Sequence, residues 1–252
     1  IFWYVESVAS VVQKNSMMNW FTRGFVRVVH WLLLKAHVKD PALRAKLTPD
    51  FPIGCKRLLF SNDWFKTLAQ PHVELVTDAP VEITEDSVVT ADGTRRRVDA
   101  IVYGTGFTAT QFLAPMEIRG LGGESLSERW KDGAQGYFGL AVAGFPNFFT
   151  IYGPNTNLGV GTIIYMLERQ QRYIVKCIEL LRDRGLRYLD VKDQAQREFN
   201  NELHQRSQQL VYGGGCNSWY IDKNGNVASW PWGWKRFSED MREPVMADFE
   251  IS

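Results

Sequence analysis

Two glycine-bearing segments of the sequence could hold a cofactor. One is D-A-I-V-Y-G-T-G-F, residues 99–107, and the other is G-P-N-T-N-L-G-V-G-T-I-I, residues 153–164, which separates an apolar run from a long helical pattern. Glycine at the carboxyl end of a strand lets the backbone turn and approach a ligand or another backbone. Exposed amides at the start of the following helix, aided by its dipole, could bind an anion or the polar edge of a planar cofactor. Both segments are therefore candidate binding sites.

Neither glycine-bearing segment completes the dinucleotide-binding fingerprint. Gly159 and Gly161 supply the first two glycines of G-x-G-x-x-G, but Ile164 stands where the third belongs. The segment G-L-G-G-E-S, which starts at Gly120, lacks the third glycine as well. We therefore expect no self-sufficient nucleotide-binding half in this chain.

Other kinds of chemistry have little support in the sequence. The four histidines have no carboxylate or cysteine at the spacing of metal ligands, so no metal site is expected. A G-x-S-x-G elbow is missing, which argues against acyl-transfer hydrolysis. The three cysteines, Cys55, Cys177 and Cys216, are odd in number and form no C-x-x-C motif. They argue against a disulfide scaffold or a zinc site and favour a reducing compartment.

Composition limits the partners of the chain. Its 252 residues, 45% of them apolar, can form the core of one large domain or two smaller ones. The 29 basic and 28 acidic residues supply no strong positive field for nucleic acid, and the basic run 95–97 is expected at a solvated loop edge. The apolar segment 25–38 is interrupted by Arg27, His30 and Lys35, so it falls short of the ~20 residues that cross a bilayer. No targeting segment is visible, and a cytoplasmic location is expected.

Local signals predict the elements that position the two segments. Residues 1–47 read as helical, with Asp40 and Pro41 starting a short helix, and a boundary is expected near residue 50. Ser61 or Asn62 should cap the next helix. Between residues 72 and 98 lie β-rich runs, two of them joined by an Asp-Gly hairpin turn at residues 92 and 93.

The rest of the chain alternates between apolar runs and helical patterns. The run 98–103 predicts a strand covered on both faces, and a second such run ends at residues 153 and 154. A long helix is expected over 162–184, with Gly185 as its stop and one apolar stripe. A strand over 186–191 and a helix over 193–210 follow. This alternation predicts an α/β layered fold. The residues of the expected stripe are Leu167, Ile174, Ile178 and Leu181.

Four segments resemble the carboxyl-terminal half of the class B flavoprotein monooxygenases, and most closely their Baeyer–Villiger branch. They are L-T-P-D-F-P-I-G-C-K-R (47–57), D-A-I-V-Y-G-T-G-F (99–107), G-F-P-N-F-F-T-I-Y-G-P-N-T (144–156) and N-S-W-Y-I-D (217–222). They occur in the family's order, and with their spacing they cover about residues 40–235. The resemblance implies a partial flavoprotein with two dinucleotide-binding, Rossmann-like domains. The two G-x-G-x-x-G loops and the F-x-G-x-x-x-H-x-x-x-W fingerprint of the family are not found in this sequence.

The resemblance also implies a division of the chain and a set of site residues. Residues 1–50 would end a helical insertion, 51–96 would be the second part of the NADP domain, and 97–252 the second part of the FAD domain. Arg57 falls at the family's active-site arginine, where a guanidinium would keep the oxygen nucleophile anionic. Lys56 falls near the 2′-phosphate of NADPH, and Trp219 at a contact to its nicotinamide nucleotide. Contacts to FAD fall on Thr105, Gly106, Gly153, Pro154, Asn155 and Thr156.

The implied reaction uses FAD, NADPH and dioxygen to insert one oxygen atom next to a ketone carbonyl, giving an ester or a lactone. One alternative is a related enzyme that oxidises nitrogen or sulfur with an electrophilic oxygen species, and Arg57 favours the ketone branch. A second alternative is a non-catalytic fragment or interaction module, and the isolated chain is expected to be colourless and inactive. A flavin disulfide reductase would need a redox cysteine pair, which the sequence lacks. Gly104 departs from the family, which commonly has alanine there.

Overall fold

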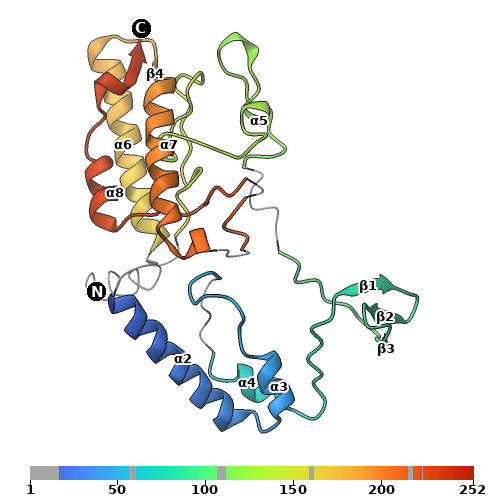
Figure 1. Cartoon of the computed structure of the whole chain (residues 1–252). Coiled ribbons are helices and arrows are strands. Elements are labelled where there is room, and N and C mark those ends of the chain that lie inside the picture. Colours follow the sequence, from blue (N-terminus) through green and yellow to red (C-terminus); the bar gives the residue numbers. More distant parts are fainter. Residues whose placement is uncertain are drawn as a thin grey trace. The chain divides into compact units, whose positions relative to one another are not determined.

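A computed structural model describes residues 17–56, 59, 61–106, 112–158, 162–214, 218–222 and 224–252. Their contacts form two units, whose elements are labelled in Figure 1. The smaller unit holds residues 24–50, 59 and 61–106, and the larger unit holds 17–23, 51–56 and the described residues from 112 to 252. Residues 51–56 thus make their contacts in the larger unit, whereas the family resemblance groups them with the residues up to 96.

Of the three helices described first, α3 begins where its cap signal predicts. Helix α2 spans Met17–His37, α3 spans Pro41–Lys46 and α4 spans Trp64–Leu68. The Asp40 carboxylate accepts the N–H groups of Ala42 at 2.9 Å and Leu43 at 3.3 Å, so it caps α3 as predicted. Before α4, the Ser61 hydroxyl accepts the Trp64 N–H at 3.1 Å. The N-cap position itself is Asp63, whose side chain makes no cap hydrogen bond, so neither predicted candidate is the cap residue of α4.

A three-stranded antiparallel sheet completes the smaller unit. Strands β1 (Pro80–Ile83), β2 (Ser87–Thr90) and β3 (Arg95–Arg97) pair in that order, and Gly93 turns between β2 and β3 with φ +82°. The predicted Asp-Gly hairpin is therefore confirmed. Residues 95–97 do not form the expected loop edge, because they pair with β2 as β3, but the outer two arginines are solvent-exposed as expected. The middle one, Arg96, is only 25% exposed at its side chain.

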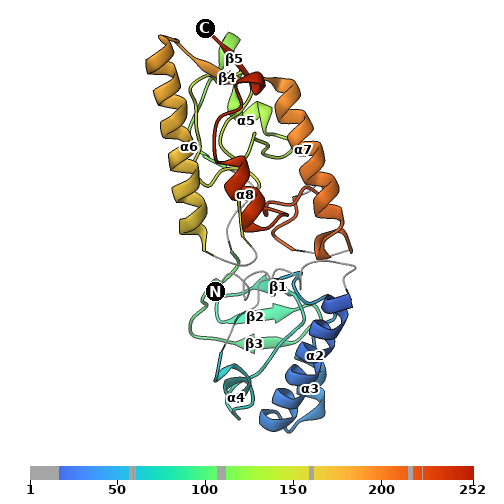
Figure 2. The ribbon, with the colours of Figure 1, turned by 90° about the vertical axis from the view of Figure 1, so that its left-hand side faces the viewer.

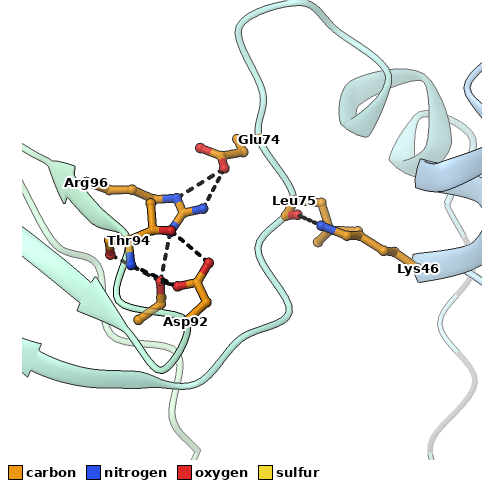
Figure 3. Close-up of polar contacts among 7 residues, drawn as sticks. Lys46, Glu74, Leu75, Asp92, Thr94 and Arg96 are labelled. Carbon is orange, nitrogen blue, oxygen red and sulfur yellow. Dashed lines mark hydrogen bonds and ion pairs between the residues drawn. The ribbon is translucent and has the colours of Figure 1, made fainter.

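A polar network fixes the hairpin to the preceding chain (Figure 3). Arg96 donates from Nε and Nη2 to Glu74 Oε1, at 3.1 and 2.8 Å, and from Nη1 to Thr90 Oγ1 at 2.8 Å. Asp92 accepts from the Thr90 hydroxyl at 2.6 Å and from both the N–H and the hydroxyl of Thr94, at 3.0 and 2.8 Å. Lys46, at the end of α3, donates to the Leu75 carbonyl at 3.3 Å. The segment before β1 is therefore tied to both the sheet and α3.

The Asp92 carboxyl is expected to titrate at a pKa of about 2, because the Thr90 hydroxyl and the Thr94 donors bind its charged form. Its folded-state pKa lies below its unfolded value of ~3.9. The carboxylate therefore stabilises the fold above about pH 3.9, and this contribution is lost as the pH falls toward 2. An NMR pH titration of the carboxyl carbon measures the pKa directly.

Thr90→Val should raise the Asp92 pKa, since it removes the donor with the largest effect. Thr84→Val is the matched control, because the Thr84 hydroxyl donates to the Ser87 carbonyl and not to Asp92. An Asp92 pKa near 3.9 in the unchanged protein would contradict the network described here.

The expected strand over residues 98–103 is absent from the described structure. Residues 98–106 have no regular secondary structure, and Val102 and Tyr103 are 94% and 71% exposed. A strand needs neighbours that bond its N–H and C=O groups, and no described strand pairs with this run. The prediction of a strand covered on both faces is therefore wrong for the described structure, because the described residues supply nothing that covers this run.

The larger unit contains three principal helices and a small sheet. Helix α6 spans Ile163–Arg184, α7 spans Asp193–Gln208 and α8 spans Trp234–Asp240, and α8 lies in front of α6 and α7 in the view of Figure 2. Gly185 ends α6 in the left-handed conformation with φ +61°, as predicted. The expected strand over 186–191 is the shorter β4 (Leu189–Val191), which pairs antiparallel with β5 (Phe249–Ile251). The remaining elements are η2 (Leu121–Gly123), α5 (Leu126–Arg129), η3 (Val211–Gly214) and η4 (Met246–Asp248).

A main core joins these elements. It includes Tyr173 from α6, Phe199 from α7, Phe237 from α8 and Phe249 from β5. Two residues of the stripe expected on α6, Ile174 and Leu181, pack against the main core, whereas Ile178 is 54% exposed. The buried residues of the helix are Met166, Gln170, Tyr173 and Cys177, so the buried face only partly coincides with the expected stripe. The second expected strand, before Gly153, forms only the isolated bridge Ala141↔Phe149 among the described residues.

Helices and strands both occur, as the predicted α/β class requires, although the sheets of the described residues are small and antiparallel. No helix in the described ranges is long and apolar enough to span a membrane.

Candidate cofactor-binding site

The loop Gly153–Thr156 precedes α6 and is stabilised by a hydrogen bond between its own residues. The Thr156 hydroxyl donates to the Gly153 carbonyl at 2.7 Å, and Asn155 takes the left-handed conformation with φ +63°. Both Asn155 and Thr156 are buried. Gly159 and Gly161, the next glycines of this segment, lie outside the described residues. The loop therefore has a fixed shape set by its own hydrogen bonds.

Glycine is required at position 153 because two backbones meet there. A Cβ at Gly153 would overlap the Gly139 carbonyl oxygen and the Thr150 hydroxyl. That hydroxyl donates to the Gly139 carbonyl at 3.1 Å, so it cannot move freely. A Cβ at Gly139 would in turn overlap the side chain of Thr156. The loop is thus packed against the turn at Gly139, a contact that no sequence motif indicated.

A hairpin near the carboxyl end holds the other side of the loop. Asn155 Nδ2 donates to the Val227 carbonyl at 2.8 Å, and the Asn157 N–H donates to the Ala228 carbonyl at 3.2 Å. Asn157 also forms a parallel bridge with Ser229. The Oδ1 atom of Asn155 is buried without a hydrogen-bond partner among the described residues. An unpaired buried acceptor costs free energy unless a donor reaches it, so this atom is open to a donor from outside the described residues.

The segment that carries Lys56 packs into the same unit. Cys55 is fully buried, and Lys56 is exposed with its ammonium 4.5 Å from the centre of the Phe51 ring. Cys55 is disulfide-bonded, whereas the cysteine count argued against a disulfide scaffold. Disulfide formation depends on which cysteines the fold brings together, and an odd total does not prevent it. Arg57, the predicted catalytic residue, lies outside the described residues.

The Trp219 side chain stacks on a buried tyrosine. Its ring stacks on Tyr220 with centroids 4.0 Å apart and an interplanar angle of 28°, and the residue is 50% exposed. Tyr220 is only 1% exposed, and its ring lies 5.8 Å from that of Tyr212. One face of the indole is therefore covered by protein, while half of its surface is open to solvent.

A small cluster connects these three segments. We call it the bracket cluster; it consists of Cys55, Leu210, Val211, Tyr212, Tyr220 and Val227, with Phe51 and Ile221 packed against it. Cys55 precedes Lys56, Tyr220 follows Trp219, and Val227 accepts the hydrogen bond from Asn155. The structure therefore brings Lys56, Trp219 and the Gly153–Thr156 loop to one set of apolar residues. The sequence motifs assigned no role to Tyr220, Val227 or Phe51, although Tyr220 and Phe51 stand within the quoted segments 217–222 and 47–57.

Thr105 and Gly106 belong to the smaller unit. Both are exposed, and Gly106 has φ +84°, the conformation that favours glycine. A Cβ at Gly104 would meet no atom within 4 Å, so the alanine that is common there in the family would fit.

A cavity of about 250 Å³ lies beside Asn155 and Val227. Side chains of α7 complete it, including Arg197, Asn200 and His204. Neither Lys56 nor Trp219 lines it, so the predicted contacts to the nicotinamide cofactor lie elsewhere on the larger unit. No group of three or more metal-ligating side chains occurs in the part of the chain that the structure describes.

Comparison with known proteins shows extensive similarity to one group of enzymes. The chain is 40% identical over 231 residues to a Baeyer–Villiger monooxygenase of Streptomyces coelicolor, an alignment that covers 90% of this chain and 44% of that protein. It is 38% identical to a Baeyer–Villiger monooxygenase of Pseudomonas aeruginosa, over 85% of this chain and 40% of that protein. No protein-family model matches. The chain thus spans less than half the length of these two relatives.

The fold is also similar to a solved structure. The crystal structure of OTEMO in complex with FAD and NADP aligns with a TM-score of 0.83 and 26% sequence identity, over 96% of this chain and 46% of that one.

Proposed function

Because this chain is homologous to the carboxyl-terminal half of Baeyer–Villiger monooxygenases, we propose that the full-length protein is an FAD- and NADPH-dependent monooxygenase that converts a ketone to an ester or a lactone. The observation that carries the proposal is the 40% identity to such an enzyme over 90% of this chain. The solved complex of OTEMO with FAD and NADP supports the choice of cofactors.

The arrangement of the larger unit fits these cofactors. The exposed ammonium of Lys56 suits a phosphate group, and the open indole surface of Trp219 suits a flat nicotinamide ring. The unpaired Oδ1 of Asn155 and the closely packed glycines of its loop suit a ligand edge that carries a donor. Bound FAD would carry the oxygen chemistry itself.

The residues of this chain have positioning and electrostatic roles in the proposal. Lys56 and Trp219 hold NADPH, and the segments around Gly106 and Gly153 shape the FAD site together with Thr105, Pro154, Asn155 and Thr156. Arg57 supplies a fixed positive charge that keeps the attacking oxygen anionic. We further propose the domain division implied by the family: residues 1–50 in the helical insertion, 51–96 in the NADP domain and 97–252 in the FAD domain.

The test supplies the full-length protein with NADPH, FAD, isotopically labelled dioxygen and a panel of cyclic, linear and aromatic ketones. We expect an ester or lactone that contains one labelled oxygen atom, detected by mass spectrometry, with matching consumption of NADPH. Amine and sulfide substrates run in parallel, and products from these alone would support the nitrogen- or sulfur-oxidising alternative.

The isolated 252-residue chain is the second arm of the test. It is expected to remain colourless after incubation with FAD and to oxidise no NADPH. Tight FAD binding and turnover by this chain alone would contradict that expectation. A colourless, inactive chain would support the alternative that these 252 residues by themselves are a non-catalytic fragment or interaction module.

A further inference from the structure

We propose that Tyr220 is a positioning residue that places two NADPH contacts at once, Trp219 directly and Lys56 through the bracket cluster. The proposal rests on the proposed function, in which Trp219 and Lys56 bind NADPH. Neither the family resemblance nor the sequence motifs gave Tyr220 a role. Tyr220 stacks on its neighbour Trp219 and shares a cluster with Cys55, the residue before Lys56.

The contact to Trp219 is direct. Tyr220 is buried and its ring covers one face of the indole at 4.0 Å, so it determines the plane in which the open part of the indole is presented. The backbone around Tyr220 is also fixed, because its carbonyl accepts the Ala228 N–H at 2.7 Å. A smaller side chain at position 220 would leave the indole free to tilt.

The connection to Lys56 passes through the cluster. Cys55 packs in the same cluster as Tyr220, and Phe51 packs against it from the surface. The Lys56 ammonium lies over the face of the Phe51 ring at 4.5 Å, a cation–π contact that restrains a long side chain. The Cys55 N–H donates to the Pro52 carbonyl at 3.0 Å, which closes a turn between Phe51 and Lys56. Loss of the Tyr220 ring should therefore loosen the support of Lys56 as well as that of Trp219.

The bracket cluster is separate from the main core. The main core comprises residues of α6, α7, α8, β4 and β5 and the segment around Tyr137, and it shares no member with the bracket cluster. A substitution at Tyr220 should thus affect NADPH binding more than global stability, while an equivalent substitution in the main core should do the reverse.

The test compares variants of the full-length protein by calorimetric titration with NADP⁺, which gives the Kd without turnover, and in steady-state assays with NADPH and a turned-over ketone. We expect Tyr220→Leu to raise the KM for NADPH about tenfold with little change in the KM for the ketone, and Tyr220→Phe, which keeps the ring, to restore it. Phe237→Leu in the main core is the matched control, expected to lower Tm and leave the KM for NADPH unchanged.

Double variants test the coupling itself. Tyr220→Leu combined with Trp219→Ala should weaken NADPH binding less than the sum of the single changes, because both remove the same support. Equal effects of Tyr220→Leu and Phe237→Leu on the KM for NADPH would overturn the proposal. If Tyr220→Leu fails to fold, Phe51→Leu tests the support of Lys56 instead, because it removes the ring under the Lys56 ammonium. An unchanged KM for NADPH in that variant would overturn the Lys56 half of the proposal.

Single variants of Lys56 and Trp219 distinguish a wrong assignment of the NADPH contacts from a wrong role for Tyr220. If Lys56→Ala and Trp219→Ala each leave the KM for NADPH unchanged, the contacts assigned in the proposed function are wrong. If those variants raise it while Tyr220→Leu does not, the contacts hold and the positioning role of Tyr220 is wrong.

Discussion

Arg57→Ala in the full-length protein is expected to lower kcat for ketone oxidation by about a hundredfold or more, while NADPH oxidation remains detectable. The guanidinium stays protonated at any working pH, so it can hold an oxygen anion in its nucleophilic form. Without that charge the oxygen species should decay without attacking the ketone. Parallel assays of ester formation and NADPH consumption measure the two rates separately.

Two further variants separate charge from geometry at this position. Arg57→Lys should recover only part of the rate, because an ammonium lacks the planar fork of donors. Arg95→Ala removes another arginine, one that is exposed on β3 in the smaller unit, and should change neither rate. Ester formation at the original rate in Arg57→Ala would show that Arg57 has no such role.

Gly153→Ala is expected to destabilise the larger unit by about 2 kcal/mol, or about 4–8 °C in Tm. The added methyl group would overlap the Gly139 carbonyl oxygen and the Thr150 hydroxyl, which are hydrogen-bonded to each other. Neither atom belongs to a flexible chain end, so the backbone of the loop must shift. Thermal unfolding followed by circular dichroism measures the change.

Gly104→Ala is the matched control for that substitution. A Cβ at Gly104 meets nothing within 4 Å, and the variant should keep the original Tm. If both variants lowered Tm equally, the close packing of Gly153 against Gly139 would not be what makes glycine necessary there. FAD binding by the full-length Gly153→Ala variant should also weaken if its loop shapes the proposed FAD site.

Features that depend on neighbouring residues in the sequence were predicted well. The Asp40 cap, the turn at Gly93 and the helix stop at Gly185 all follow from side-chain or backbone preferences within a few residues. The main errors concern contacts with distant residues. The run 98–103 has the composition of a covered strand but no described partner, and Ile178 lies outside the buried face of α6. The disulfide at Cys55 likewise depends on a distant partner, which a cysteine count does not identify.

The family resemblance and the segments that could bind cofactors follow from the sequence, because those signals are short runs of residues with fixed spacing. The sequence also supplied Arg57, which lies outside the described residues, as the predicted catalytic residue. By contrast, the meeting of residues 51–56, the loop Gly153–Thr156 and the hairpin after Trp219 at the bracket cluster is visible in the folded protein and not in the sequence. Such a cluster forms when apolar side chains from distant segments exclude water together, and local spacing does not specify which segments will meet.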